Sequence, residues 1–169
     1  MMARRDHEQR PTRDRKILGL GWRHLDLIHA GRTFLRRRGV EHSRLGGILL
    51  HRIDGPDPGL DLHDHPWPFL SIVLRGGYTE EALYEPGDSH RGTRRTWRRW
   101  SAHRMPLNVA HSIVDVQPGT VTLVLRGRKV RRWGFYLPTG WVDWAEYDYD
   151  ARRPNTVISS DVDERMVQS

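Results

Sequence analysis

The sequence contains no cysteine, which excludes disulfides, thiolate metal sites, iron–sulfur clusters and cysteine nucleophiles. Lysine is scarce as well, because Lys16 and Lys129 are the only two among 28 basic residues. No run of about 18 apolar residues is present that would span a membrane. Residues 1–16 are charged and lack the apolar stretch of a secretory signal. We therefore expect a soluble, cytoplasmic protein without membrane contacts.

Arginine supplies most of the positive charge, and it is unevenly distributed. The 28 basic and 21 acidic residues give a net charge of +7. Segment 91–104 carries six arginines and no acid, and segment 126–132 carries five basic residues and no acid. Arginine suits bidentate contacts with phosphate or carboxylate. A small anionic molecule is one partner this predicts, and nucleic acid bound through 91–104 is another. Alternatively, these arginines keep exposed strands soluble.

The chain of 169 residues suits one domain. We expect a disordered basic N-terminus at 1–16, a folded domain at 17–150 and a flexible tail at 151–169, since both ends are polar and charged. Residues 22–38 are predicted to form a short helical lead, because Leu25, Ile28 and Leu35 are spaced for one helix face.

From Gly46 onward the pattern changes to short strands separated by turns. The strand candidates are 46–53, 69–75, 111–116 and two more within 120–137, with Gly- and Pro-containing turns between them. Many short strands at a spacing of about 8–12 residues favour an all-β sandwich or barrel.

Three of the ten histidines have the spacing of metal ligands. His63 and His65 are two residues apart, so on a strand their side chains share one face. Pro106 and Asn108 predict a turn that places His111 at the start of a strand. Three neutral imidazoles can hold one divalent ion and leave coordination positions open. The prediction is a mononuclear metal site.

These residues resemble the two sequence motifs of the cupin superfamily. In the first motif, His63 and His65 match the paired histidines and Gly76 matches the closing glycine, but Phe69 and Leu70 stand where a glutamate is usual. The pattern HDHPW at 63–67 is also similar to a group of small bacterial and phage cupins.

The second motif is matched less completely. Pro106 matches its proline and His111 its histidine, whereas Asn108 stands at its internal glycine. Trp100 and Asp115 replace its opening glycine and its asparagine.

The resemblance implies a cupin jelly roll, also called a double-stranded β-helix, and it favours a homodimer. The missing glutamate implies a ligand set of three histidines, as in the thiol dioxygenases among cupins. Fe(II) is the favoured ion, because imidazole suits it and open positions admit dioxygen. Zn, Mn and Ni fit the same ligands. The hypothesis is an iron oxygenase acting on a small anionic substrate.

Two other functional classes stay open at this point. One is a non-redox cupin enzyme, such as an isomerase, epimerase or lyase. The other is a non-catalytic cupin that binds a small ligand or nucleic acid. Oxygen consumption with candidate substrates distinguishes an oxygenase from a non-redox enzyme. Salt-dependent binding of DNA or RNA would support the non-catalytic binding protein.

Strand alternation predicts which side chains surround the metal. Beyond the paired histidines, alternate residues share their face. We expect Trp67 and Ser71 to contact substrate and Phe69 to fill the space of the absent glutamate. Arg75 either clamps an anionic substrate or pairs with a nearby acid at the barrel mouth.

The remaining candidates follow from the same alternation. Asp115 is predicted to orient a ligand histidine from behind. Tyr78 and His103 are candidate acid–base groups, with Glu80 considered beside them either as such a group or as a cross-strand partner. Asp64 points away from the metal face and is rejected as a ligand.

Overall fold

A computed structural model describes residues 9–11, 16–17, 20–42, 44–59, 61–83 and 92–148 of the chain. The predicted tail at 151–169 and most of the predicted N-terminal segment 1–16 lie outside these residues. The proposed domain boundaries therefore stay predictions. Among the described residues, no helix has the length and hydropathy needed to cross a membrane.

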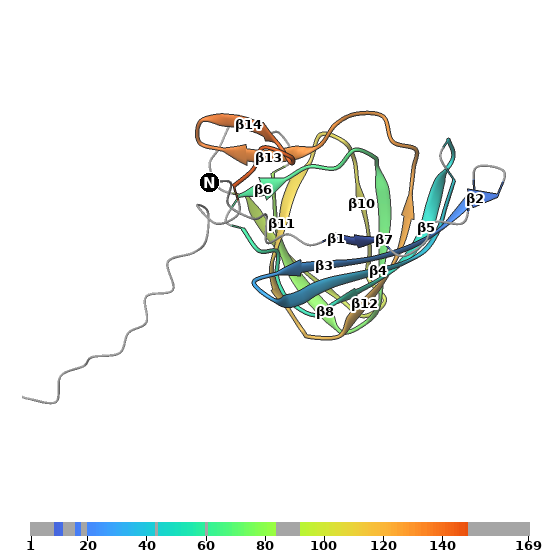
Figure 1. The fold of residues 1–169 in the computed structure, drawn as a ribbon. Helices are drawn as coiled ribbons and strands as arrows, with labels where there is room; N and C mark the ends of the chain where they lie inside the picture. Colours follow the sequence, from blue (N-terminus) through green and yellow to red (C-terminus); the bar gives the residue numbers. More distant parts are fainter. Residues whose placement is uncertain are drawn as a thin grey trace, which may run out of the picture.

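The described residues form two antiparallel sheets that face each other around a barrel (Figure 1). The larger sheet has the order β1-β3-β4-β5-β12-β7-β10, with β2 paired to β3. Its strands are β1 (Gln9–Pro11), β2 (Lys16–Ile17), β3 (Leu20–His29), β4 (Arg32–His42), β5 (Gly46–Ile53), β7 (Phe69–Arg75), β10 (Ala102–Met105) and β12 (Thr120–Arg126).

The smaller sheet has the order β14-β13-β6-β11-β8-β9. Its strands are β6 (Leu62–His63), β8 (Gly77–Leu83), β9 (Thr93–Arg98), β11 (Ala110–Val116), β13 (Gly134–Leu137) and β14 (Gly140–Asp143). Neighbours such as β12 between β5 and β7 are distant in sequence, so the chain crosses repeatedly between the sheets, as in a jelly roll. The predicted all-β jelly roll is confirmed.

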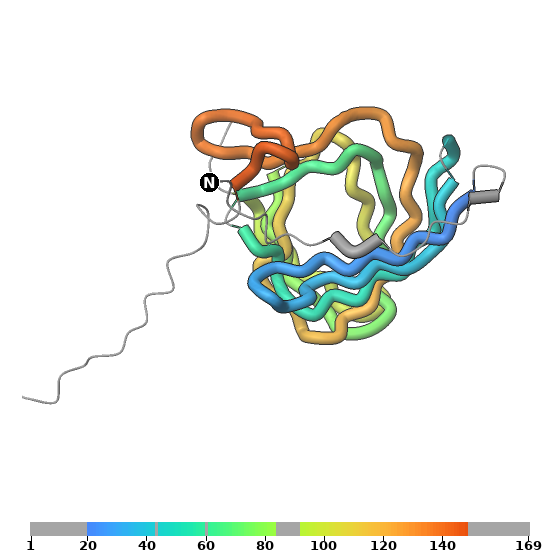
Figure 2. Tube along the Cα trace, viewed as in Figure 1, coloured from blue at the N-terminus to red at the C-terminus, as the bar shows by residue number. Residues whose placement is uncertain are grey.

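The helix predicted at 22–38 is wrong, because this segment forms β3 and β4. Ala30 and Gly31 have positive φ angles of 48° and 74°, which suits a tight hairpin turn. Along β3, Arg23, Leu25 and Leu27 line the cavity described below, which is a period of two. β4 pairs with β5 over eight residue pairs. This pairing favours a strand more strongly than the spacing of Leu25, Ile28 and Leu35 favours a helix. Figure 2 traces the three strands side by side.

Two apolar clusters fill the space between the sheets. One contains Ile53, Val73, Tyr78 and Val116. The other contains Ala82, Met105 and Val109, and Phe69 packs against it. Fully burying each large apolar side chain contributes about 1.5–3 kcal/mol, so the clusters hold the strands that carry the histidines.

Gly76 connects β7 to β8 in a conformation that favours glycine. Its φ is +71°, and a Cβ there would meet the Thr120 side chain. That Thr120 hydroxyl donates to the Gly77 carbonyl at 2.9 Å and accepts from the Gly77 amide at 3.0 Å. The glycine of the first motif therefore keeps β8 in register with the rest of the barrel.

Candidate metal centre

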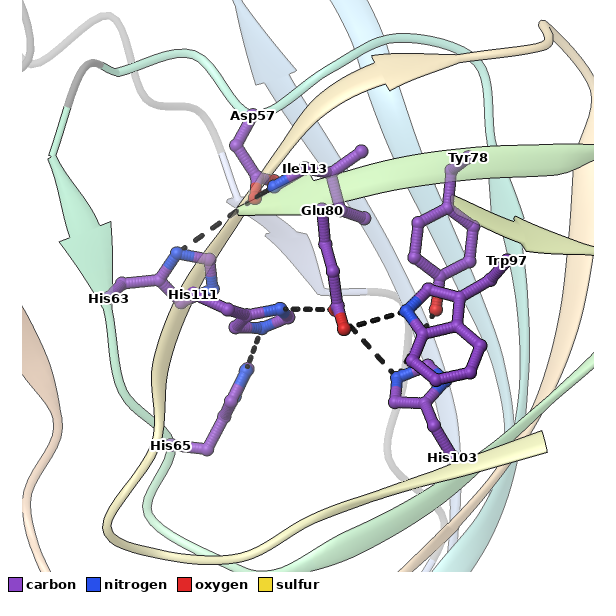
Figure 3. Close-up of polar contacts among 9 residues, drawn as sticks. All are labelled: Asp57, His63, His65, Tyr78, Glu80, Trp97, His103, His111 and Ile113. Atoms are coloured by element: carbon purple, nitrogen blue, oxygen red, sulfur yellow. Dashed lines mark hydrogen bonds and ion pairs between the residues drawn. The ribbon is translucent and has the colours of Figure 1, made fainter. Parts of the chain in front are cut away.

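The three predicted ligands converge at one point inside the barrel. His63 ends β6 and lies directly opposite His111 of β11, while His65 follows in the adjoining loop. Nitrogen atoms of the three rings lie within 4.8 Å of one another. Figure 3 shows His63 and His65 on either side of His111. The predicted three-histidine group is confirmed.

Asp64 fixes the backbone between the two neighbouring histidines. Its side chain is 1% exposed and points away from the site, as alternation predicts. One carboxylate oxygen accepts from the Gly134 amide at 2.8 Å. The other accepts from Arg131 at 2.8 Å, from Trp141 at 3.2 Å and from Tyr136 at 3.3 Å. These four donors anchor the loop to β13, so both histidines keep their direction.

Glu80 orients His111 from behind. This carboxylate is 1% exposed and accepts a hydrogen bond from His111 Nδ1 at 3.1 Å and from Trp97 Nε1 at 2.6 Å (Figure 3). Burial opposes ionisation, but the contacts with His111 outweigh it and lower the pKa of Glu80. An ionised Glu80 holds the His111 proton on Nδ1, which leaves Nε2 free to face an ion.

Asp115, the residue predicted for this role, is exposed. A bulge between Ile113 and Asp115 interrupts the alternation of β11. Glu80 therefore makes the contact with His111 that was expected of Asp115.

Two of the ligand histidines, His63 and His65, are neutral at physiological pH. Burial lowers the pKa of His63 to about 4, although Asp57 opposes this from 3.9 Å. Burial likewise lowers the pKa of His65 well below its ordinary value, helped by the charge of His111. Metal binding requires deprotonated imidazoles, so these rings need not lose a proton first.

The donor geometry fits a single ion. His65 Nε2 and His111 Nε2 are 2.8 Å apart. Adjacent nitrogen ligands on an ion with bonds of about 2.1 Å are separated by about 3 Å. Phe69 lies edge-on to His65, with ring centroids 4.9 Å apart, as expected of a side chain in the position of the absent glutamate. The group contains three histidines and no carboxylate.

The histidines open onto a cavity of about 400 Å³ between the sheets. Of the predicted site residues, Trp67, Phe69, Ser71, Tyr78 and His103 line it. Arg75 does not, since it is exposed at the end of β7, where the pairing with β12 shifts register. The cationic side chains that line the cavity are instead Arg23, Arg37 and Lys129. Arg37 belongs to β4, and sequence reasoning missed it because its segment was predicted to be helical.

Tyr78 and His103 form a second polar group in the cavity wall. The Tyr78 hydroxyl lies 3.4 Å from His103 Nε2, which is 3.8 Å from Glu80. The His103 ring stacks on Trp97 at 4.3 Å. Trp97 is therefore an inward residue of β9. Burial raises the pKa of Tyr78 and lowers that of His103, so the phenol keeps its proton at neutral pH.

The fold and the site define a double-stranded β-helix protein with a three-histidine metal site. It is a cupin.

Comparison with known proteins gives structural neighbours only. No protein-family model matches the sequence, and a search of the curated proteins finds no relative. KdgF from Halomonas sp. is 17% identical with a TM-score of 0.46, the alignment covering 64% of this chain and 88% of KdgF. Fe(II)-HppE is 14% identical with a TM-score of 0.49, over 63% of this chain and 56% of HppE. An RmlC-like cupin from Shewanella frigidimarina is 16% identical with a TM-score of 0.40. The alignment covers 58% of this chain and 78% of that cupin.

Proposed function

We propose that this protein is a mononuclear non-haem iron enzyme, an oxygenase that acts on a small anionic substrate. The observation that carries the proposal is the ligand set of three imidazoles without a carboxylate, facing a cavity of about 400 Å³. Imidazole suits Fe(II), and three protein ligands leave positions open. Zn, Mn and Ni would be held by the same residues.

The ion would be held by His63, His65 and His111, and when bound it would supply positive charge and open positions for substrate and dioxygen. Glu80 keeps the His111 proton on Nδ1, away from the ion. Apolar residues of the cavity wall, such as Phe69 and Phe135, exclude water from the ligand rings. Tyr78 lines the cavity, and its hydroxyl lies 3.4 Å from His103 Nε2.

A second candidate is a non-redox metal enzyme, such as an isomerase, epimerase or lyase. It is favoured by Tyr78 and His103, which line the cavity as a neutral acid–base pair 3.4 Å apart. Proton transfer at carbon needs such groups, whereas an oxygenase does not require them.

The test is anaerobic loading with Fe(II), followed by nitric oxide, which reports open positions on iron through the electronic spectrum. We expect a new nitrosyl absorption in the wild type and none in His111→Ala. His24→Ala removes an exposed histidine outside the site and should behave like the wild type. A loaded protein that binds nitric oxide but consumes no oxygen with any of a panel of carboxylic and phosphonic acids favours the second candidate. An equal spectrum for His111→Ala would overturn the site itself.

A further inference from the structure

Arg37 lies in the cavity wall, and none of the described carboxylates pairs with it. We propose that Arg37, held in place by His51, binds the carboxylate of an acid whose remaining body is apolar, and so presents that acid to the three histidines. This inference deepens the proposed function and rests on it for the reaction, but the binding step stands on the residues below.

Arg37 and His51 are directly opposite in the register of β4 and β5. Arg37 Nε donates to His51 Nε2 at 3.0 Å. His51 can accept because burial, and then the charge of Arg37, lower its pKa well below the ordinary value. The contact uses Nε alone, so the planar guanidinium is fixed while its two terminal nitrogens remain available for a bidentate carboxylate.

The charges around Arg37 are not balanced. Arg23 and Arg126 both bond to Glu41, at 2.9 and 3.0 Å, so a single carboxylate serves two guanidinium groups. Among the described residues, no carboxylate comes within ion-pair distance of Arg37. Burial lowers the pKa of Arg37 to about 10, which still leaves it charged at neutral pH. A part-buried cation of this kind is stabilised by an anion that enters the cavity.

The surroundings of Arg37 define the rest of the ligand. Six apolar side chains from β3, β4 and β5 line the same cavity: Leu25, Leu27, Phe34, Leu35, Leu49 and Ile53. Sites of this kind use a few polar groups to fix orientation and apolar walls to bind the body of the ligand. The ligand class is therefore an apolar or aromatic acid rather than a sugar or a polyphosphate.

The anion site lies near the metal ligands. The charge of Arg37, and that of His51, contribute to lowering the pKa of His65. Trp67 and Phe69, next to the histidines, line the same cavity as Arg37. An acid bound at Arg37 would thus place its nearby carbon atoms toward His65, and this makes Arg37 a specificity-determining residue.

The test measures binding to protein that has been stripped of metal by a chelator, because an acid could otherwise bind the ion directly. The probes are 3-phenylpropanoate and octanoate, with 3-phenylpropan-1-ol and octan-1-ol as neutral analogues of the same shape, followed by calorimetry. The variants are Arg37→Gln, Arg37→Lys and the control Arg36→Gln. Arg36 is the neighbouring residue, half-exposed and 3.6 Å from Asp54.

We expect the wild type and Arg36→Gln to prefer each acid over its alcohol by about tenfold or more. Arg37→Gln should lose that preference while its affinity for the alcohols stays within about twofold. Arg37→Lys keeps the charge and should keep part of the preference, so it serves as the reporter if Arg37→Gln does not fold.

Equal affinities of the wild type for acid and alcohol, binding of neither acid, or an unchanged preference in Arg37→Gln would each overturn the inference. Failure of the iron proposal looks different. A protein that binds no metal would still show the Arg37-dependent preference, because binding is measured without metal. Conversely, a protein that binds iron but ignores Arg37 would refute this inference alone.

Discussion

Single residues set the proton positions at the metal site. Glu80 is buried and accepts from both His111 and Trp97, so it decides which nitrogen of His111 faces the ion. A glutamine at this position has the same shape, but only its amide oxygen accepts hydrogen bonds. Its NH2 group would face one of the two N–H donors.

Exchange of Glu80→Gln should therefore weaken metal affinity by about 10–100-fold without removing a ligand. Competition against a chromophoric chelator measures this affinity. The control is Glu81→Gln, the next residue, whose half-buried carboxylate pairs with the exposed Arg94 at 2.9 Å. This variant should bind metal like the wild type. An unchanged affinity in Glu80→Gln would contradict the assigned role of this carboxylate.

His51 predicts a dependence of stability on pH. Its pKa is lowered in the folded protein, so below about pH 6.5 the unfolded chain takes up a proton that the folded chain does not. The contribution of His51 to stability is present above that pH and is lost as the pH falls. Below about pH 6.5, the free energy of unfolding of His51→Gln should therefore fall less steeply with decreasing pH than that of the wild type. The difference in slope is up to about 1.4 kcal/mol per pH unit.

Urea unfolding of metal-free protein at pH 7.5, 6.5 and 5.5 measures the effect, with the exposed His24→Gln as the matched exchange. If the wild type and His51→Gln lose stability in parallel as the solution is acidified, His51 is not neutral in the folded state.

Local spacing was sufficient to predict part of the site at residue scale. His63 and His65 converge as the spacing predicts, although only His63 lies in a strand, and the period of two along β7 brings Phe69 and Ser71 to the cavity. The period failed at Arg75, where the pairing with β12 shifts register, and at Asp115, beyond a bulge. A bulge depends on the partner strand, which lies elsewhere in the sequence.

At the scale of elements, the β3–β4 hairpin is the main difference from the sequence prediction. Leu25, Ile28 and Leu35 fit a helix as well as a strand when considered alone. The strand is selected because β5 offers an edge to β4 along its length. The hairpin matters for the proposed binding site, since β3 and β4 contribute Arg37 and much of the apolar cavity wall.

The turn between β7 and β8 provides a prediction at the same scale. Gly76→Ala should destabilise the protein by about 3 kcal/mol or more, because it combines a left-handed backbone with overlap onto Thr120. Gly119→Ala is the matched control, since its φ is +79° and no atom lies within 4 Å of a Cβ there. It should cost only about 1–2 kcal/mol. Chemical unfolding measures both, and equal losses would contradict the close contact at Gly76.

At the scale of the whole molecule, the fold class could be predicted more securely than the reaction. Short strands and turns gave the jelly roll, and two sequence motifs located the histidines on it. The cavity could not be predicted in this way, because its walls come from strands between residues 23 and 144 that meet only after folding. The substrate depends on that cavity, so its class required the structure.

The most direct test of the whole account is the amount of divalent metal bound per chain after equilibrium dialysis against Fe(II) under anaerobic conditions. We predict one ion per chain for the wild type and for His24→Ala, and none above background for the double variant His63→Ala/His111→Ala. Elemental analysis of the dialysed protein gives the number. A double variant that keeps its ion, or a wild type that binds none, would show that the three convergent imidazoles do not form a metal site.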